Sequence, residues 1–151
     1  MTATQVSGAV NAALQAYLDE SDVPPDCPSP AIVLDRLERE VAKRFGAVPI
    51  LRDMMETFFL RSDGTFFGWD NDTPGDTSAI RVHAAESSKL VLMVWGARRH
   101  PALRVLLPVR PASASDCRIC NGAGTCPASH TVGAPIPCPA CSGLGWREEL
   151  A

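Results

Sequence analysis

The chain has 151 residues, of which 46% are hydrophobic, and a formal net charge of −3. This length and composition suit one ordinary domain with a small appendage and exclude a disordered polar protein. The N-terminus has no basic start, and no window is long and apolar enough for a signal peptide or a membrane span. We therefore expect a cytoplasmic protein, in which paired cysteines indicate metal ligands before disulfides.

Two helices are predicted near the N-terminus. Residues 4–19 carry apolar side chains at helical spacing, which indicates an amphipathic helix. After a proline-rich break, Ser29 followed by Pro30 has the pattern of an N-cap with proline at the first helical position. Gly46 is expected to end this second helix. We expect both helices to cover a sheet.

Antiparallel strands are predicted next. Two aromatic runs within residues 57–70 flank Asp63-Gly64, a pair suited to a tight hairpin turn. The alternating residues 79–85 predict a third strand, and the apolar run 89–95 is short enough for a buried strand. Residues 101–107 predict a short helix at most.

This order of elements predicts an α+β fold in two parts. N-terminal helices and an antiparallel sheet form a body, residues 1–110. A small cysteine-rich tail, residues 111–151, follows. Pro108 and Pro111 stiffen the connection, so we expect the tail to pack beside the body, with Trp146 as the anchor.

The tail contains five of the six cysteines, and four of them form two C-x-x-C pairs. Cys117 and Cys120 form the first pair and Cys138 and Cys141 the second, with seventeen residues between the pairs. Two thiolates on one tight turn can occupy two corners of a tetrahedron, about 2.3 Å from an ion, and a second turn supplies the other two. The spacing therefore predicts one structural Zn²⁺ with no open coordination position.

Each pair continues with the same pattern, C-x-x-C-x-G-x-G, in "CRICNGAG" and "CPACSGLG". Glycine at these positions permits positive φ, so that the turn can fold under the metal and direct amide N–H groups at the sulfurs. The pattern resembles the cysteine-rich zinc domain of DnaJ-type chaperones over residues 117–145. In that family two repeats hold one zinc ion, which implies one ion here. The chain has no J domain, so the resemblance does not imply co-chaperone activity; such repeats also occur in small bacterial and plastid binding proteins.

Two other uses of the paired cysteines are open. Disulfides are disfavoured by the absence of a secretion signal. A redox C-x-x-C belongs at a helix N-terminus after a strand, whereas both pairs here lie in Gly/Pro-rich segments. Cys126, with His130 four residues on, is a spare ligand, a redox sensor or a bystander, and we favour the bystander. Cys27 is interpreted as a partly buried structural cysteine.

The sequence gives no support to catalysis. Asp70, Asp72 and Asp76 faintly resemble a calcium loop but lack its further ligands, so a solvated turn is the interpretation. His83 and His100 have no neighbours that suggest a triad, and no nucleotide-binding or hydrolase motif is present. We expect no enzyme, and we expect the tryptophans, Trp69, Trp95 and Trp146, to be core or rim aromatics.

The charge distribution bears on the partner. Residues 1–96 carry eight Lys/Arg against fourteen Asp/Glu, whereas residues 97–118 carry five arginines against one aspartate. The acidic total disfavours nucleic acid. We expect a non-enzymatic zinc-binding adaptor with a protein partner and no membrane association; the alternative is a thiol-dependent chaperone or disulfide oxidoreductase. The order of elements in the body is similar to that of SUKH-type immunity proteins, which implies one version of the adaptor.

Overall fold

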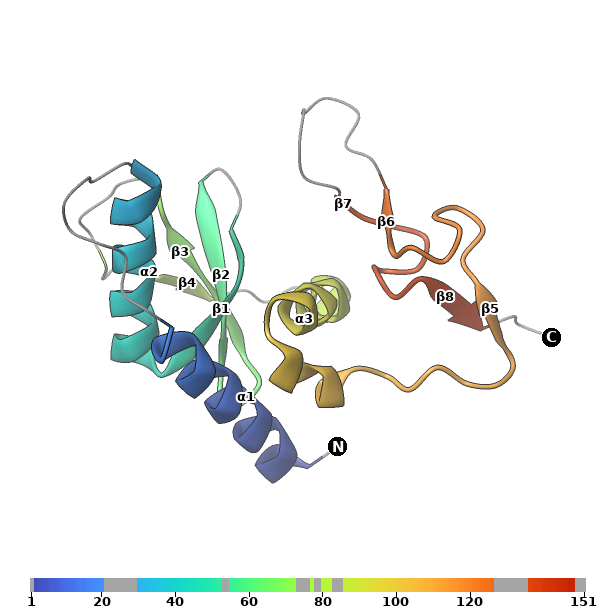
Figure 1. Ribbon diagram of the computed structural model, residues 1–151, viewed down its shortest axis with the longest axis horizontal. Helices are drawn as coiled ribbons and strands as arrows, with labels where there is room; N and C mark the ends of the chain where they lie inside the picture. Colours follow the sequence, from blue (N-terminus) through green and yellow to red (C-terminus); the bar gives the residue numbers. More distant parts are fainter. Residues whose placement is uncertain are drawn as a thin grey trace.

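The computed structural model describes residues 2–20, 30–52, 55–72, 77, 80–82, 86–126 and 136–148. Its elements in chain order are α1 (Ala3–Leu18), α2 (Pro30–Phe45), β1 (Ala47–Arg52), β2 (Glu56–Arg61), β3 (Phe66–Asp70), β4 (Ile80–Val82), α3 (Glu86–Arg99), the 3-10 helix η1 (Pro101–Leu106), β5 (Ala114–Asp116), β6 (Thr125–Cys126), β7 (Ile136–Pro137) and β8 (Trp146–Glu148). Helices combine with antiparallel sheets, so the predicted α+β class is confirmed (Figure 1).

The two predicted N-terminal helices are present. Thr2 caps α1 through a reciprocal pair of hydrogen bonds, in which its hydroxyl accepts from the Gln5 N–H and the Gln5 side chain accepts from the Thr2 N–H. Helix α2 begins at Pro30 and ends before Gly46, whose φ of +59° is the left-handed conformation that glycine adopts readily. The predicted cap Ser29 and the cysteine Cys27 lie outside the described residues.

The body sheet has the antiparallel order β1-β2-β3-β4. Its central hairpin turns at Asp63-Gly64 as predicted, with Gly64 at φ +86° and the Asp63 carboxylate accepting from the Thr65 N–H at 2.9 Å. Strand β4 confirms the first part of the predicted third strand, and residues 83–85 lie outside the description. Strand β1 was not predicted, because Pro49 interrupts its pattern. The structure places β1 at the sheet edge, with a register irregularity between Pro49 and Leu51, where a missing N–H is tolerated.

The prediction of a strand over residues 89–95 is wrong, because this segment lies within helix α3. A short apolar run is compatible with a strand or with a helix buried on more than one side, and periodicity cannot separate them. Gly96 allows α3 to approach the sheet closely, since a Cβ there would lie 3.1 Å from Ile50 and 3.2 Å from Leu103. On another side, Val94 contacts the tail at Gly143. Residues 89–95 are mostly apolar because the body covers α3 on one side and the tail covers it on another. The predicted short helix that follows is confirmed as η1.

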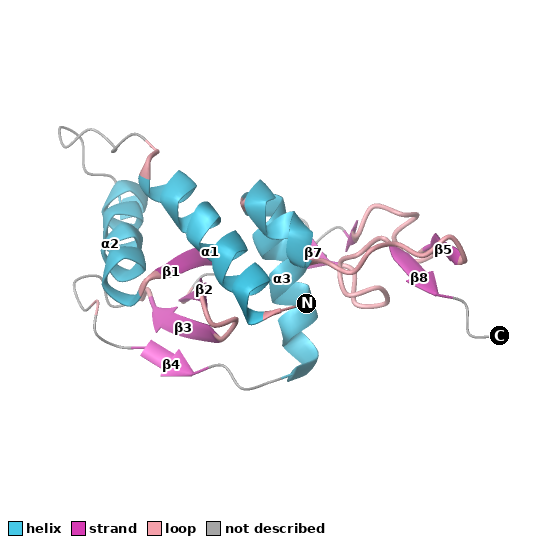
Figure 2. Cartoon of the chain, turned by 90° about the horizontal axis from the view of Figure 1, so that it is seen from below, coloured by secondary structure: helices cyan, strands magenta, loops and turns pink. Residues whose placement is uncertain are grey.

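The core of the body lies between the helices and the sheet (Figure 2). Phe59 and Phe67 stack on neighbouring strands at a ring separation of 5.1 Å, and Phe45 of α2 meets Phe67 edge-on. Trp69 is fully buried, as expected of a core aromatic. Helix α3 lies between this sheet and the cysteine-rich tail, so it is the element through which the two parts of the chain meet (Figure 1).

Candidate metal centre

The two C-x-x-C-x-G-x-G repeats fold into the same turn. In the first, the Gly122 N–H donates to the Cys117 carbonyl at 3.1 Å; in the second, the Gly143 N–H donates to the Cys138 carbonyl at 3.1 Å. The backbone conformations also match. Asn121 and Ser142 have φ of 54° and 55°, and the four repeat glycines all have positive φ, with 80° and 77° at Gly122 and Gly124 and 85° and 86° at Gly143 and Gly145.

The last glycine of each repeat directs its amide at a sulfur. The Gly124 N–H donates to Cys120 Sγ and the Gly145 N–H donates to Cys141 Sγ, both at 3.2 Å. These bonds confirm the expectation that the glycines let the turn present N–H groups to the sulfurs. Such donors stabilise negative charge on a thiolate, which is the form that binds a metal.

The repeats are joined reciprocally. The Cys117 N–H donates to the Gly145 carbonyl at 2.9 Å, and the Cys138 N–H donates to the Gly124 carbonyl at 3.0 Å. The strands that flank the repeats pair in the same reciprocal way. Strand β5, before the first repeat, pairs with β8, after the second repeat. Strand β7, before the second repeat, pairs with β6, after the first repeat. The described part of the tail therefore has approximate two-fold symmetry. This pairing was not predicted from the sequence, and the shared pattern of the two repeats is at most an indirect signal of it.

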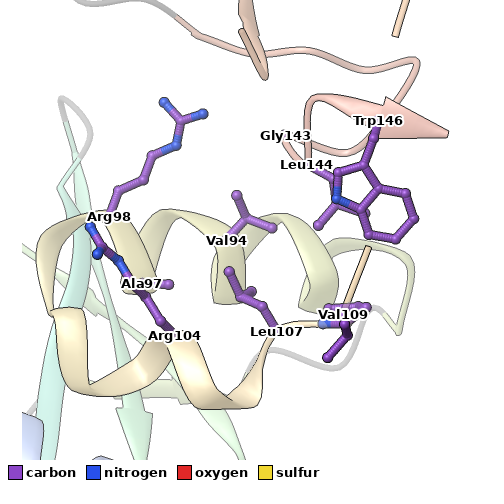
Figure 3. Close-up of a pocket in the computed structure, with 10 residues that line it drawn as sticks. Val94, Ala97, Arg98, Arg104, Leu107, Val109, Gly143, Leu144 and Trp146 are labelled. Atoms are coloured by element: carbon purple, nitrogen blue, oxygen red, sulfur yellow. The ribbon is translucent and has the colours of Figure 1, made fainter. Parts of the chain in front are cut away.

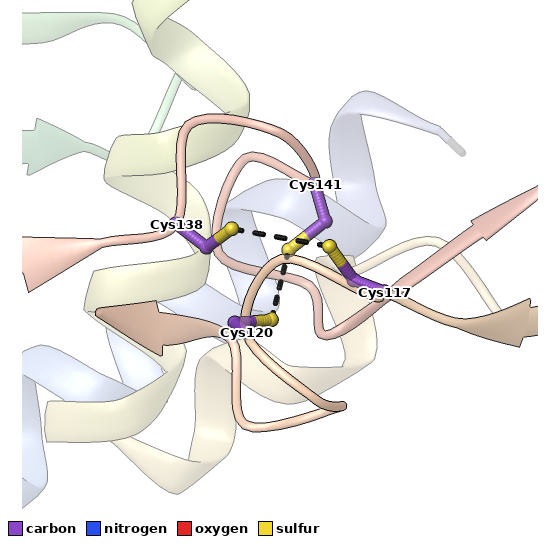
Figure 4. A group of neighbouring side chains, drawn as sticks. All are labelled: Cys117, Cys120, Cys138 and Cys141. Carbon is purple, nitrogen blue, oxygen red and sulfur yellow. Dashed lines mark hydrogen bonds between the residues drawn. The ribbon is translucent and has the colours of Figure 1, made fainter.

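This symmetry brings the four paired sulfurs together (Figure 4). All four lie within 4.8 Å of one another, with 3.9 Å between the sulfurs of Cys117 and Cys138 and 3.8 Å between those of Cys120 and Cys141. A disulfide bond is about 2.05 Å long, so these cysteines are not bridged. A tetrahedron with bonds of about 2.3 Å has edges of about 3.8 Å, which matches the two distances. The geometry fits one metal ion held by four sulfurs.

Burial and electrostatics favour a cation at this position. The exposed fractions of the four cysteines range from 0% to 8%. Burial raises the pKa of Cys141 to about 11. Burial also opposes ionisation of Cys138, but backbone N–H groups of Cys141 and Ala140 outweigh it and hold the pKa of that thiol at about 6. Several thiolates confined in one small space repel each other, and a bound dication removes that repulsion.

Cys126 lies beside the centre without joining the group of four mutually close ligand atoms. It is half-buried in β6 and packs against the cluster, and burial together with a hydrogen bond to the Cys138 sulfur raises its pKa. His130, the other candidate in this part of the tail, lies outside the described residues.

The weaker candidates from the sequence do not form a second site within the described residues. The Asp70 carboxylate accepts from the Asp72 N–H at 2.9 Å, which is a local turn contact, and Asp76 and His83 are not described. His100 is buried, bonded through Nε2 to the Pro49 carbonyl and packed edge-on against Tyr17. Burial lowers its pKa, so it is a neutral core histidine at physiological pH.

The tail contacts the body through α3. The Arg98 guanidinium packs over the Trp95 ring and donates through Nη2 to the Ala123 carbonyl at 3.1 Å. Val94 meets Gly143, where an added Cβ would lie 3.1 Å away. Trp146 is half-buried and lines a pocket with residues of α3 and of the segment after η1. These contacts agree with the predicted packing of the tail, with Arg98 as an anchor that the sequence did not indicate.

Comparison with known proteins adds no name to this site. No known protein family, curated protein or solved structure matches the chain. The resemblance of the tail to DnaJ-type repeats and of the body to SUKH-type proteins therefore stays a prediction. Among the described residues, no helix combines the length and apolar character that crossing a bilayer requires.

Proposed function

We propose that the chain is a non-enzymatic, zinc-binding protein-interaction protein. One structural Zn²⁺ would be held by Cys117, Cys120, Cys138 and Cys141. The observation that carries the proposal is the convergence of four buried sulfurs within 4.8 Å, at the edge lengths of a tetrahedral thiolate site. When bound, the ion would supply cross-linking between the two turns.

The choice of zinc rests on the donor set. Four thiolates in tetrahedral arrangement select zinc or iron among the common metals, and closed four-cysteine sites of this kind are typical structural zinc sites. Four protein ligands leave no coordination position for a substrate or a reactive water, which supports a structural and not a catalytic ion. The DnaJ-type resemblance supports the same assignment.

A binding role for the whole protein follows from what the site would do. A structural ion fixes the tail on α3, and the tail and the body then present one surface to a partner protein in the cytoplasm. An immunity-like protein that blocks a toxin is one version of this role, supported by the SUKH-like order of elements in the body. The buried thiols give the alternative, a redox or chaperone function of the C-x-x-C pairs, less support, because a redox pair must be accessible.

Metal analysis of the full chain tests the first part of the proposal. Protein purified without added metal is expected to contain one zinc per chain by elemental analysis. Cys138→Ser is expected to lose it, whereas Cys126→Ser, which changes the neighbouring thiol outside the group of four, is expected to retain it. Iron in place of zinc, or a chain that folds its tail without metal, would contradict the assignment.

Affinity purification from the native host tests the second part. The wild-type chain is expected to retain a protein partner that the Cys138→Ser chain loses, because the surface that includes the tail is then disordered. An insulin-reduction assay on the zinc form distinguishes the alternative. Turnover at the rate of a thioredoxin by the zinc form would replace the binding role with a redox one.

A further inference from the structure

A pocket of about 410 Å³ lies where the tail meets the body (Figure 3). Both parts of the chain form its walls. Helix α3 and η1 with the following segment contribute one side, and Gly143 and Leu144 of the second repeat and Trp146 of β8 contribute the other. The pocket exists only while the tail is folded against α3, and its volume lies in the range of about 300–1,000 Å³ that is typical of ligand sites.

The two ends of the pocket differ in chemistry. Arg98 and Arg104 lie at one end, and Trp146 and Val109 at the other, with Val94 and Leu107 between them (Figure 3). Val109 is 89% exposed although it lines the pocket. The apolar surface therefore continues beyond the pocket into solvent.

The two guanidinium groups at the cationic end of the pocket, those of Arg98 and Arg104, form no ion pair with a described residue. Two neighbouring arginines already have ion pairs, since Arg99 pairs with Glu38 at 2.8 Å and Arg110 pairs with Asp116 at 2.8 Å. Arg98 binds the Ala123 carbonyl and covers Trp95, but no carboxylate among the described residues pairs with it. Arg104 is exposed and has no ion pair to a described residue. Two guanidinium groups thus border an apolar pocket with no acidic residue among those that line it.

We infer that this pocket binds an acidic peptide segment of a partner protein, with an apolar side chain of the segment placed against Trp146 and Val109 and a neighbouring carboxylate bound by Arg104. This inference deepens the protein-binding proposal and rests on it. Arginine presents a planar fork that matches a carboxylate, and tryptophan and arginine are both enriched among the hot-spot residues of protein interfaces.

A peptide fits these observations better than two other ligands. A small molecule enclosed by the pocket would leave most of the exposed Val109 side chain uncovered, whereas an extended chain can cover the pocket and this side chain together. Single-stranded nucleic acid requires a basic groove with stacking aromatics along it, and the described lining of this site offers two arginines and one tryptophan in a chain of net charge −3.

Selection of peptides against the full zinc-loaded chain tests the inference. A displayed library of random peptides is expected to yield sequences in which Asp or Glu stands close to Leu, Phe or Trp. The best peptide is then labelled, and its affinity is measured by fluorescence anisotropy. Arg104→Glu and Val109→Asp are each expected to weaken binding at least about tenfold, since one removes a charged hydrogen bond and the other an apolar contact. Both residues are exposed, so neither change disturbs the core.

The controls separate the site from net charge and from the metal. Lys43→Glu makes the same change in charge on an exposed position of α2 and is expected to alter affinity less than about twofold. Zinc is measured in every preparation. A chain without zinc that still binds such peptides through Arg104 contradicts the zinc proposal alone. Four results with the zinc-loaded chain would overturn this inference. The chain could select no peptide, or it could select peptides without acidic residues. It could also bind the selected peptide equally well after both substitutions, or bind a labelled oligothymidine through Arg104 instead.

Discussion

The body and the tail each bury a cluster of side chains, but the clusters differ in kind. The body buries aliphatic and aromatic residues from its helices and its sheet in one continuous core. The main buried cluster of the described tail consists of four cysteines, with Cys126 and Ala140 packed against it. Apolar area stabilises the first cluster, whereas the second has too little of it to fix a fold without a cross-link. If the proposed metal is bound, the body and the tail depend on different sources of stability, apolar burial in one and a cross-link in the other.

The largest expected effect comes from removing one sulfur. Cys141→Ser is expected to release the metal and unfold the described tail, residues 114–126 and 136–148, while the body stays folded. Metal binding and folding are one event in such a site, with about 10–16 kcal/mol of apparent binding energy involved. Amide hydrogen exchange should show loss of protection in the tail only.

Cys126→Ser is the matched control, since Cys126 lies beside the cluster but outside the group of four. It should leave both the metal content and the protection pattern unchanged. If Cys141→Ser unfolds the whole chain, the tail is part of the main core and the two parts are not stabilised separately.

The next effect is specific to the body, which has one charged centre inside its apolar core. Glu38 is 1% exposed, and its carboxylate accepts from Arg52 Nη2 at 2.7 Å, Arg99 Nη2 at 2.8 Å and the Tyr17 hydroxyl at 3.1 Å. Glu38→Ala removes the acceptor of the Tyr17 hydroxyl and of Arg99, and leaves Arg52 paired with Asp35 alone. The change should lower the free energy of unfolding by about 2–3 kcal/mol, less than for a fully buried pair because the arginines are partly exposed.

Denaturant unfolding measures this change, and Asp35→Asn is its control. Asp35 also pairs with Arg52, at 2.6 Å, but its side chain is 41% exposed, so its loss should cost no more than about 1 kcal/mol. Metal content should stay the same in both variants. If the two substitutions lower the free energy of unfolding equally, the burial of Glu38 adds nothing to its contribution to stability.

The sequence predicted the tail better than the body, and the reason is physical. A metal site needs particular residues at particular spacings, so Cys117, Cys120, Cys138 and Cys141 and the glycines after them could be recognised one by one. The reciprocal pairing of the repeats, and the contact of Arg98 with Ala123, depend on how distant segments meet, and local spacing does not encode them.

In the body, the predictions succeeded where local chemistry decides the structure. The hairpin at Asp63-Gly64 and the end of α2 at Gly46 follow from backbone conformations that glycine adopts. They failed where tertiary position decides. Helix α3 is apolar on several sides because the sheet and the tail both cover it, and β1 tolerates Pro49 because it lies at an edge.

A third prediction concerns how much the backbone conformation at Gly145 contributes to the stability of the tail. Gly145→Ala would place a Cβ 2.6 Å from the Gly122 carbonyl oxygen, at a residue with φ of +86°. The strain and the clash with backbone should lower the stability of the tail by about 1–3 kcal/mol and weaken metal retention against a chelator.

Gly122→Ala tests the effect of the positive φ without the clash against backbone. Its φ of +80° is similar, but an added Cβ would meet only the exposed Asp116 side chain, at 3.2 Å. Competition with a chelator should rank wild type, then Gly122→Ala, then Gly145→Ala. The reverse order would mean that the reciprocal contact between the repeats does not hold the centre together.

A fourth prediction concerns the junction of the two parts. Trp146 is half-buried against the pocket wall, so Trp146→Ala should remove about 1 kcal/mol of docking energy, below the 1.5–3 kcal/mol of a fully buried large side chain. Small-angle scattering should show a larger mean separation of tail and body with the metal still bound. If the wild type already scatters as two independent bodies, the contacts of Arg98 and Trp146 do not fix the junction.

The smallest effect is a dependence of the stability of the body on pH that comes from a buried histidine, whereas any dependence of the tail on pH comes from its thiols. Burial, and to a lesser degree the charge of Arg99, lower the pKa of His100 below its usual 6.5, against the opposing influence of the Pro49 carbonyl, Glu20 and Glu38. The unfolded chain therefore binds a proton near pH 6.5 that the folded chain does not, so His100 contributes its full stabilisation above that pH and loses it as the pH falls toward the folded pKa. The unfolding free energy of the body should decline on acidification from pH 7, and His100→Gln, which keeps a donor for the Pro49 carbonyl, should flatten the decline. An unchanged slope in that variant would assign the acid sensitivity to the carboxylates around Arg52 and Arg99 instead of to the buried imidazole.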